Sequence, residues 1–228
     1  MTEIWYGLVK AVELIVSLDP EVVEVVGRSL IVSGSACVIA SVICLPLASL
    51  IHFRSFPGKR VIINLIQTLF SLPTVLVGLF LFVLLSRGGP LGGLGLLFTP
   101  AAMVIGQTLL ISPVLLGLTI SALNGVAREL IDTAVSLGAD GFQVAWLALR
   151  EARYAVMAAV IMAFGRAISE VGCAVMVGGN IKGFTRVITT TISLESSKGD
   201  LELSIALGII LLLIALLVNV SLSRLQQR

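Results

Sequence analysis

No charged residue occurs between Leu30 and Ile51, and this apolar run limits the possible folds more than any other feature of the sequence. A helix needs about 20 consecutive apolar residues to cross the ~30 Å hydrocarbon core of a bilayer, and the run is long enough. Upstream, Asp19 can cap a helix, Pro20 suits its first position and Glu21 suits its first turn. The sequence therefore predicts a membrane-spanning helix here.

Four further apolar segments extend this prediction to five spans. Hydrophobic residues make up 57% of the chain and charged residues 12%, with a mean hydropathy of +1.10. In a soluble domain about a quarter of the residues are charged. We therefore predict an all-α integral membrane protein. The later spans are expected at about Val61–Leu85, Ala101–Ala122, Tyr154–Gly178 and Leu203–Ser223.

The first residues of the chain are predicted to lie outside these spans. Residues 3 to 17 fit an amphipathic helix with Trp5 and Tyr6 at its start, too short and too charged to cross a bilayer. We expect this helix to lie at the membrane interface. The domain division is then 1–26 for the N-terminal interfacial segment, 27–223 for the transmembrane domain and 224–228 for a tail.

Basic residues predict the orientation of the chain in the membrane. Five spans place the two ends on opposite sides. With the C-terminus inside, the inner segments hold eight Lys and Arg and the outer segments hold six. Because Lys and Arg favour the cytoplasmic side, we expect an outer N-terminus and a cytoplasmic C-terminus, with residues 127–153 in the cytoplasm.

The only long polar interruption of the apolar pattern runs from Ala127 to Arg153. Its first half has helical spacing and stops at Gly138, a residue that readily takes the left-handed conformation that closes a helix. Asp140 and Gln143 then form a capping-box-like pair at the start of a second helix. An ordinary loop whose second helix rests on the bilayer would show the same pattern. The apolar face of that helix is expected to hold Phe142, Trp146 and Leu149.

Asp132-Thr133-Ala134 followed by Gly138 resembles the EAA-x3-G signature in the cytoplasmic loop of permease subunits of ABC importers. Asp replaces Glu, Thr replaces the first Ala, and the later I-x-L-P part of the signature does not match residues 148–151. The resemblance implies that the loop forms a coupling helix in a cleft of the ATP-hydrolysing subunit. It implies coupling roles for Glu129, Asp132, Ala134, Gly138, Ala139 and Asp140.

Two charged residues, Arg166 and Glu170, lie inside the fourth predicted span, four positions apart and so on one face of a helix. Each costs roughly 2.5 to 3.5 kcal/mol at the bilayer centre, so they should pair or face a polar interior. A structural ion pair and a direct contact with substrate are both open. The run from Gly165 to Gly172 resembles the R-x3-E-F/V-G pattern of molybdate- and tungstate-type permeases.

The segment VGGNIKGFTR, from Val177 to Arg186, and TTTISLE, from Thr189 to Glu195, resemble the tungstate members of that group. With the central loop, the similarity covers about residues 27–223. Similar permeases place such a segment against their binding protein, and basic side chains there would steer an oxyanion. An ordinary extracellular loop is the alternative. The entrance implied in this way consists of Asn180, Lys182, Thr185, Arg186 and Thr189.

A path for an oxyanion needs hydroxyl, amide and backbone N–H donors more than full charges, because tight ion pairing would trap the anion. Each such side chain could instead form a hydrogen bond across helices. The candidate path residues in the predicted spans are Ser71, Thr74, Gln107, Ser112, Arg166, Ser169 and Glu170.

Enzyme motifs are missing from the sequence. It contains no phosphate-binding loop, no H-E-x-x-H, no G-x-S-x-G and no carboxylate cluster at metal-binding spacing. No basic cluster points to nucleic acid. We therefore expect no catalytic site, cofactor or metal on this chain, and Mg-ATP on a partner subunit.

The resemblance implies a type I ABC importer transmembrane domain in a prokaryotic cell membrane. It implies a homodimer, two ATPase subunits and a periplasmic or lipid-anchored oxyanion-binding protein, with tungstate as the substrate. Molybdate, sulfate or another anion is the alternative within transport. A membrane-embedded enzyme acting on lipid head groups is the alternative from another class.

Overall fold

Every regular element is a helix in the part of the chain that this computed structural model describes, residues 2–226, with side chains from 4 to 224. The predicted all-α class is therefore confirmed. Three helices are long and apolar enough to cross a membrane: α2 (Pro20–Phe53), α5 (Pro100–Asn124) and α11 (Leu201–Gln226). At the start of α2, the Asp19 side chain accepts hydrogen bonds from the N–H groups of Glu21 and Val22, as its sequence predicts.

The second predicted span is a bent pair of helices and not one straight helix. It forms α3 (Lys59–Thr68), the short η1 (Leu69–Ser71) and α4 (Thr74–Leu85), with a bend of 98°. The cause is Pro73, which has no N–H to donate and which forces Leu72 into an extended conformation at ψ 125°. The chain therefore changes direction sharply inside its apolar segment.

The fourth predicted span is also broken, between α8 (Arg153–Ile168) and α9 (Gly172–Gly178), with a bend of 57°. No proline causes this break. Ser169, Glu170 and Val171 leave the helix instead, and α9 starts in a new direction. The described residues therefore contain three long candidate spans, or five if each bent pair counts as one.

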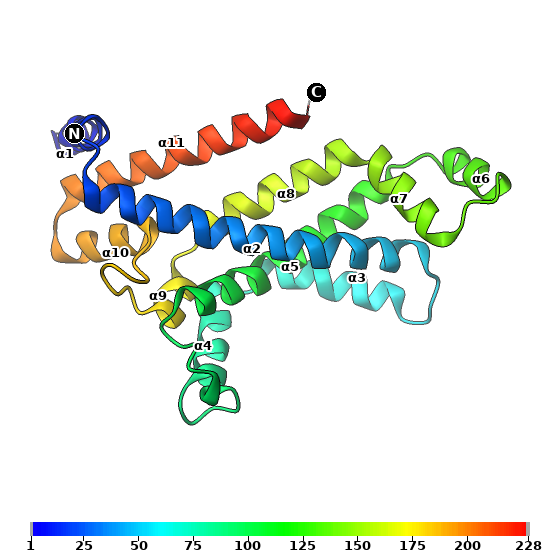
Figure 1. Ribbon diagram of the computed structural model, residues 1–228, viewed down its shortest axis with the longest axis horizontal. Helices are drawn as coiled ribbons and strands as arrows, with labels where there is room; N and C mark the ends of the chain where they lie inside the picture. Colours follow the sequence, from blue (N-terminus) through cyan, green and yellow to red (C-terminus); the bar gives the residue numbers. More distant parts are fainter. Residues whose placement is uncertain (1, 227–228) are drawn as a thin grey trace.

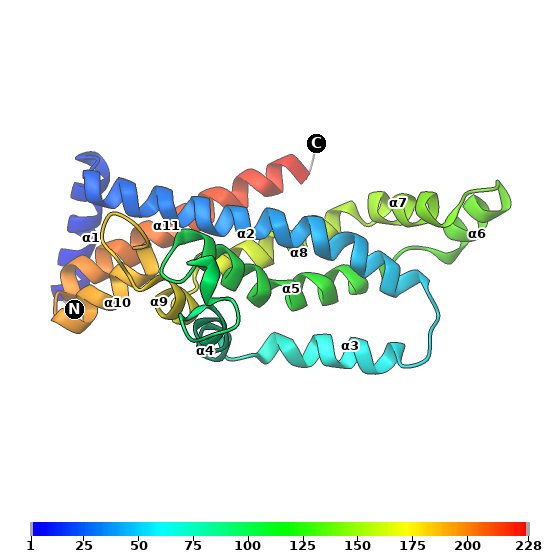
Figure 2. The same ribbon diagram turned by 60° about the horizontal axis from the view of Figure 1, so that its bottom comes forward.

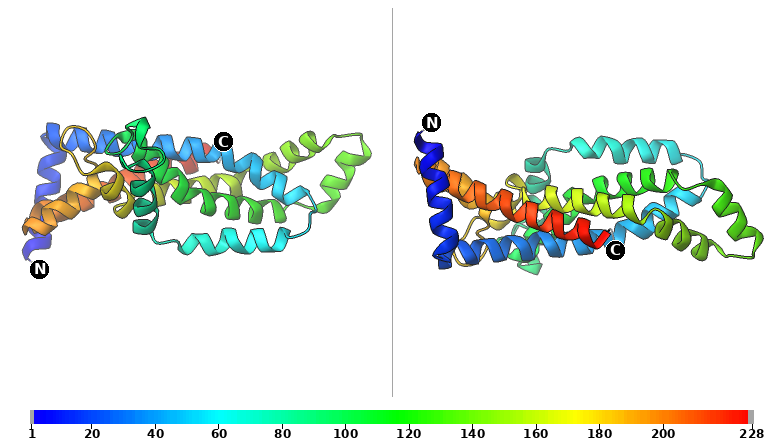
Figure 3. Two further views of the ribbon diagram at one scale, coloured as in Figure 1. Left: turned by 90° about the horizontal axis from the view of Figure 1, so that it is seen from below. Right: turned by 90° about the horizontal axis from the view of Figure 1, so that it is seen from above.

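The long helices run along the length of the molecule, and two groups of shorter helices lie at its ends (Figures 1 and 3). At one end lie α6 (Arg128–Ser136) and α7 (Gly141–Glu151). At the other end lie α1 (Thr2–Val16) and α10 (Ile188–Lys198). The polar loop predicted to be cytoplasmic and the helices α1 and α10, in segments predicted to be external, are thus at opposite ends. The short η2 (Gly92–Leu94) lies in the connection between α4 and α5.

The bundle packs through small side chains, which is how helices approach closely in lipid, where the hydrophobic effect does not drive them together. α3 lies at the edge of the bundle (Figure 2) and packs against α5, where a Cβ on Gly117 would fall 3.5 Å from Cγ2 of Ile66 and 2.4 Å from the ring of Phe70 in η1. One buried cluster, from α2, α5 and α8, consists of Cys37, Ala40, Cys44, Ile111, Leu115, Ala159, Ala163 and Ala167.

The N-terminal helix α1 crosses α11 at the end of the bundle (Figure 1). The two helices approach closely at Gly7, since a Cβ at that position would fall only 2.5 Å from Cγ2 of Ile205. Ala11 is buried in the same contact, while Trp5 and Tyr6 are exposed. The helix is thus two-faced, as predicted, and its place at the membrane interface remains a prediction.

Candidate functional site

The polar loop forms two helices joined by a tight elbow at Gly138. Gly138 has a φ of +89°, and its N–H donates to the carbonyl of Val135 at 2.9 Å. The N–H of Ala139 donates to the carbonyl of Ala134 at 3.0 Å. These two bonds satisfy the last carbonyls of α6, and they give Ala134, Gly138 and Ala139 a common role as the C-terminal cap of that helix.

The second helix starts directly after this cap. Asp140 accepts a hydrogen bond from the N–H of Gln143 at 2.8 Å, and the Gln143 side chain accepts one from the N–H of Asp140 at 2.9 Å. The predicted capping box is therefore confirmed. Hydrogen bonds therefore cap both the end of α6 and the start of α7, and they fix the backbone geometry of the elbow between the two helices.

Both loop helices present apolar and acidic side chains outward. The predicted apolar face of α7 is not the face that packs on the bundle, because Phe142 is 79% and Trp146 63% exposed while Val144 and Ala148 are buried. The predicted helical spacing of the apolar residues is right, but the side of α7 that packs on the bundle is a different one. Among the described residues of α6 none is buried. Exposed side chains also include Glu129, Asp132, Leu137 and Asp140.

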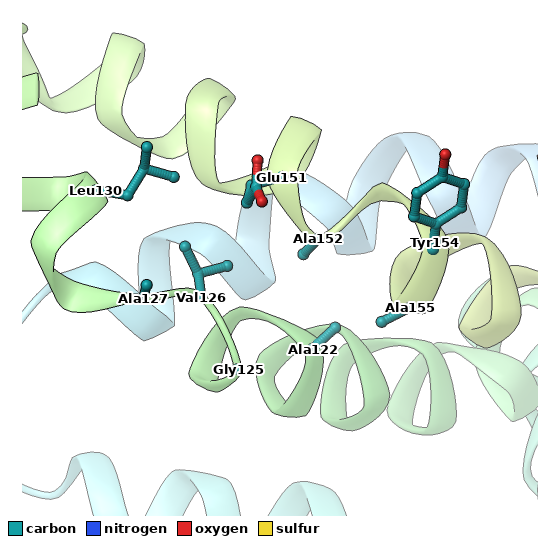
Figure 4. Close-up of a pocket in the computed structure, with 9 residues that line it drawn as sticks. All are labelled: Ala122, Gly125, Val126, Ala127, Leu130, Glu151, Ala152, Tyr154 and Ala155. Carbon is teal, nitrogen blue, oxygen red and sulfur yellow. The ribbon is translucent and has the colours of Figure 1, made fainter.

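A cavity of about 540 Å³ lies where the loop joins the bundle, and its lining comes from both stems of the loop (Figure 4). The end of α5 and the connection to α6 form one side, and the junction of α7 with α8 forms the other. The stems therefore leave space between them, and the loop rests on the bundle through α7. The lining residues are Ala122, Gly125, Val126, Ala127, Leu130, Glu151, Ala152, Tyr154 and Ala155.

The two broken spans meet at their breaks, where α4 and α9 begin. A Cβ on Gly172 would fall 2.8 Å from Oγ1 of Thr74 and 3.3 Å from the backbone nitrogen of Val75. One turn further along α4, a Cβ on Gly78 would fall 2.9 Å from Cα of Cys173. Two helix N-termini are thus side by side within the bundle, and the first N–H groups of a helix favour negative charge.

Glu170 caps α9 and does not pair with Arg166, so the expected ion pair is wrong. Its Oε1 accepts the N–H of Cys173 at 2.8 Å, and the residue is only 5% exposed. Because α8 ends at Ile168, positions 166 and 170 no longer share a helix face. The ion pairs of the described residues do not include either side chain. A buried carboxylate that already holds a helix N-terminus is a poor ligand for an anion.

Arg166 is half-buried in the last turn of α8, and its Nε is buried without a hydrogen-bond partner among the described residues. A buried guanidinium donor without a partner costs free energy, which a bound anion would recover. Ser169, in the break next to it, is exposed. The chain therefore keeps a cationic donor at the break.

The other candidate path residues divide into two groups. Ser71 is exposed at the first break, and Thr74 is half-buried at the start of α4. Gln107 is buried in α5, one position after Gly106, whose Cβ would fall 2.5 Å from Sγ of Cys173. Ser112 is elsewhere: its hydroxyl donates to the carbonyl of Thr108 in its own helix at 2.6 Å. Of these four residues, only Thr74 has a described contact across the two breaks, with Gly172.

Comparisons with known proteins identify the class to which this architecture belongs. Residues 44–228 match the family described as binding-protein-dependent transport system inner membrane component. The chain belongs to this family.

Relatives and solved structures agree with this family. The chain is 43% identical to the tungstate uptake system permease protein TupB of Peptoclostridium acidaminophilum over 97% of each chain. It is 44% identical to a probable anion ABC transporter permease protein of Haloferax volcanii, over 90% of this chain and 91% of that one. In fold it is similar to a bacterial alginate ABC transporter solved with an alginate-bound periplasmic protein, at a TM-score of 0.75 and 17% identity, over 94% of this chain and 82% of that one.

Family membership makes the chain a multi-pass membrane component of a transport system, with the fold of an ABC importer transmembrane domain. It also makes the chain a transport subunit rather than an enzyme. The polar elbow between α6 and α7 and the two helix breaks are then its candidate coupling and transport elements.

The predicted entrance of this inner membrane component is folded more tightly than its sequence suggests. Thr185 is fully buried, donates to the carbonyl of Gly178 at 2.5 Å and accepts the N–H of Ile181 at 2.9 Å. Thr189 is buried too and donates to the carbonyl of Glu170 at 2.7 Å. A direct contact of these two hydroxyls with a partner is therefore not available, which corrects their predicted role.

The remaining entrance residues surround the start of α2. Lys182 Nζ lies 2.7 Å from Oε2 of Glu21, and Arg186 lies 3.6 Å from its other oxygen. Arg28 also donates to the carbonyl of Arg186 at 2.9 Å. Asn180, at φ +50°, donates to the carbonyl of Thr190 at 3.4 Å. The positive charge predicted here is partly neutralised, because Lys182 and Arg186 form ion pairs with Glu21. These ion pairs join the outer loop to α2.

Sequence reasoning missed Glu21 and Arg28 as partners of this loop. Glu21 has a local explanation as a first-turn carboxylate, and Arg28 forms an ion pair one turn away with Glu24. Neither local signal points to a segment more than 150 residues later in the chain. Only the excess of acidic residues in the outer segments hinted at such pairing.

Proposed function

We propose that this chain is the permease subunit of an ATP-driven tungstate importer. The observation that carries the proposal is its 43% identity over 97% of its length to a tungstate uptake permease. The chain offers an oxyanion the buried Nε of Arg166, which has no hydrogen-bond partner among the described residues, and the N-terminus of α4, which no side chain caps. Molybdate and sulfate share the tetrahedral shape of tungstate, and they remain the alternatives to be tested as competitors.

The proposed assembly is a homodimer with two ATPase subunits in the cytoplasm and a periplasmic or lipid-anchored binding protein outside. Mg-ATP binds to the ATPase subunits and no cofactor binds to this chain. Exposed acidic and apolar side chains on α6 and at the elbow, such as Asp132 and Leu137, support docking of a partner there, and the similar alginate transporter was solved with a periplasmic protein. ATP closing the ATPase pair moves this loop and switches the path between inward- and outward-facing states.

The proposed orientation places α6 and α7 in the cytoplasm, and α1 and α10 outside. Support comes from the basic residues, which favour the inner segments, and from the positions of these helices at opposite ends of the bundle (Figure 1). Single cysteines at exposed positions 137 and 182 test it with a membrane-impermeant thiol reagent on intact cells. Labelling only at 182 is expected, and labelling at 137 would reverse the orientation.

Uptake measurements test the substrate. The permease with its ATPase and binding protein, reconstituted in liposomes, should import labelled tungstate only when ATP is supplied on the ATPase side. An excess of unlabelled sulfate should leave this uptake unchanged, and an excess of unlabelled tungstate should abolish it. Competition by sulfate at the same concentration as tungstate would contradict the assignment.

Replacing Gly138 by valine is expected to lower the amount of tungstate transported per ATP hydrolysed severalfold. A Cβ in the left-handed conformation costs about 1 to 2 kcal/mol per residue, so the capped elbow would no longer be the preferred geometry. No neighbouring atom lies within 4 Å of that Cβ, so the effect comes from the backbone alone.

Gly141→Val is the matched control for this elbow variant. Gly141 lies in the same elbow, its Cβ would also meet open space, and its φ is not positive. Uptake and ATPase rates of the two variants, measured in one reconstituted system, should differ clearly. Equal ratios of transport to hydrolysis in both would contradict a coupling role for the elbow.

A further inference from the structure

An apolar groove of about 740 Å³ runs between the C-terminal half of α2 and the loop helix α7. Its lining contains one charged residue, Arg54, and no acidic residue. Apart from Gly141, the groove lining lies outside the elbow and the helix breaks. Its lining residues are Ser41, Val42, Leu45, Pro46, Ser49, Leu50, Phe53, Arg54, Gly141, Phe142, Ala145, Trp146 and Leu149.

The groove lies where α2 changes from apolar to polar. The uncharged run of α2 ends at Ile51, and Arg54 follows as the residue that ends the helix. Trp146 lines the groove from α7 and is 63% exposed. An aromatic ring and a basic side chain at the end of an apolar span are typical of the boundary between acyl chains and head groups.

The guanidinium of Arg54 has no ion-pair partner in the described part of the chain. The C-terminal carbonyls of α2 do not depend on it, because Lys59 Nζ donates to the carbonyl of His52. The one cation of the groove is thus free to bind an anion beside an apolar channel. That combination fits a lipid with a negative head group. A zwitterionic lipid would use the cation less fully, and an acidic soluble ligand would leave the apolar channel unfilled.

We propose that this groove binds an acyl chain of an anionic phospholipid, with its head group at Arg54. The lipid would contact α2 on one side and α7 on the other. Because α7 is the second helix of the polar loop, the bound lipid would hold that loop against the bundle. The proposal depends on the membrane location of the chain and not on its substrate.

Tryptophan fluorescence can test this site directly, because the chain has two tryptophans, Trp5 and Trp146. Trp5→Phe leaves Trp146 as the only one. This full-length variant, purified with its ATPase partner, is placed in nanodiscs with brominated phosphatidylglycerol or brominated phosphatidylcholine at equal fractions. Brominated phosphatidylglycerol should quench Trp146 with about fivefold higher apparent affinity than brominated phosphatidylcholine. This is the preference that one basic side chain gives at an anionic surface.

Two charge variants separate a specific site from general attraction to the membrane. Arg54→Gln should bring the ratio of the two apparent lipid affinities, anionic over zwitterionic, close to one. Arg60→Gln, in the same loop but outside the groove lining, should leave it unchanged. Equal losses in both variants, or equal quenching by the two lipids, would overturn the head-group site. No quenching by either lipid would show that the ATPase or a second copy of the chain covers the groove, and would also overturn the proposal.

Discussion

Replacing Arg166 by alanine is expected to lower tungstate uptake by about tenfold or more while the folded yield stays unchanged. The buried Nε of Arg166 has no hydrogen-bond partner among the described residues, so its removal relieves an unsatisfied donor and breaks no hydrogen bond or ion pair described for the protein. A hydrogen bond between charged groups contributes about 1.5 to 3 kcal/mol, which is the basis for the expected loss when an anion passes. The measurement is initial uptake by the reconstituted transporter, normalised to folded permease.

Variants of Glu170 provide the contrast to this result. Glu170→Gln keeps an oxygen that can accept the N–H of Cys173, so stability and uptake should both stay near normal. Glu170→Ala leaves that N–H without its cap and should lower the thermal stability of the purified permease. A loss of folded protein in Arg166→Ala as large as the loss of uptake would show that Arg166 is a structural residue.

Local signals in the sequence predicted the polar loop well. Gly138 closes α6 in the left-handed conformation and Asp140 opens α7 with a capping box, because both motifs involve residues within a few positions of one another. The start of α2 at Asp19 is a third case of the same kind. Such motifs are readable in advance because their hydrogen bonds form within one turn.

A proline in an apolar run predicts a local kink, but the same reasoning could not predict which proline breaks a helix, nor a break that contains no proline. Pro46, Pro73 and Pro113 all lie in apolar runs, yet α2 and α5 continue through their prolines and only the segment at Pro73 breaks. The difference lies in what each helix packs against, which the local sequence does not contain. The expected pairing of Arg166 with Glu170 failed for the same reason, since it assumed an unbroken helix.

The hydroxyl groups of the outer segment show a second limit of sequence reasoning. Their density predicted a surface that receives a partner, but both threonines are buried: Thr185 donates to the carbonyl of Gly178, and Thr189 donates to the carbonyl of Glu170 in the break between α8 and α9. A buried loop without regular structure leaves N–H and C=O groups that side chains must satisfy. Hydroxyls serve both purposes, so composition alone cannot separate a binding surface from a folded loop.

Replacing Gly78 by alanine is expected to destabilise the permease, although alanine favours helices by about 0.5 to 1 kcal/mol over glycine. The added Cβ would lie 2.9 Å from Cα of Cys173 and 2.9 Å from Cβ of Met176. Neither atom is the free end of a flexible side chain, so α9 would have to move away from α4. Overpacking of this kind typically costs about 1 to 3 kcal/mol, which exceeds the gain in helix propensity.

Gly34→Ala in α2 is the matched control, because its Cβ would meet no atom within 4 Å. Only the gain in propensity remains there, so its melting temperature should stay the same or rise. In Gly78→Ala the melting temperature should fall by roughly 2 to 4 °C for each kcal/mol lost. Uptake should fall as well, since the contact holds the two helix N-termini side by side at the breaks. Equal melting temperatures in both variants would mean that α4 and α9 do not pack this closely, and the anion path proposed at their junction would then lose its structural basis.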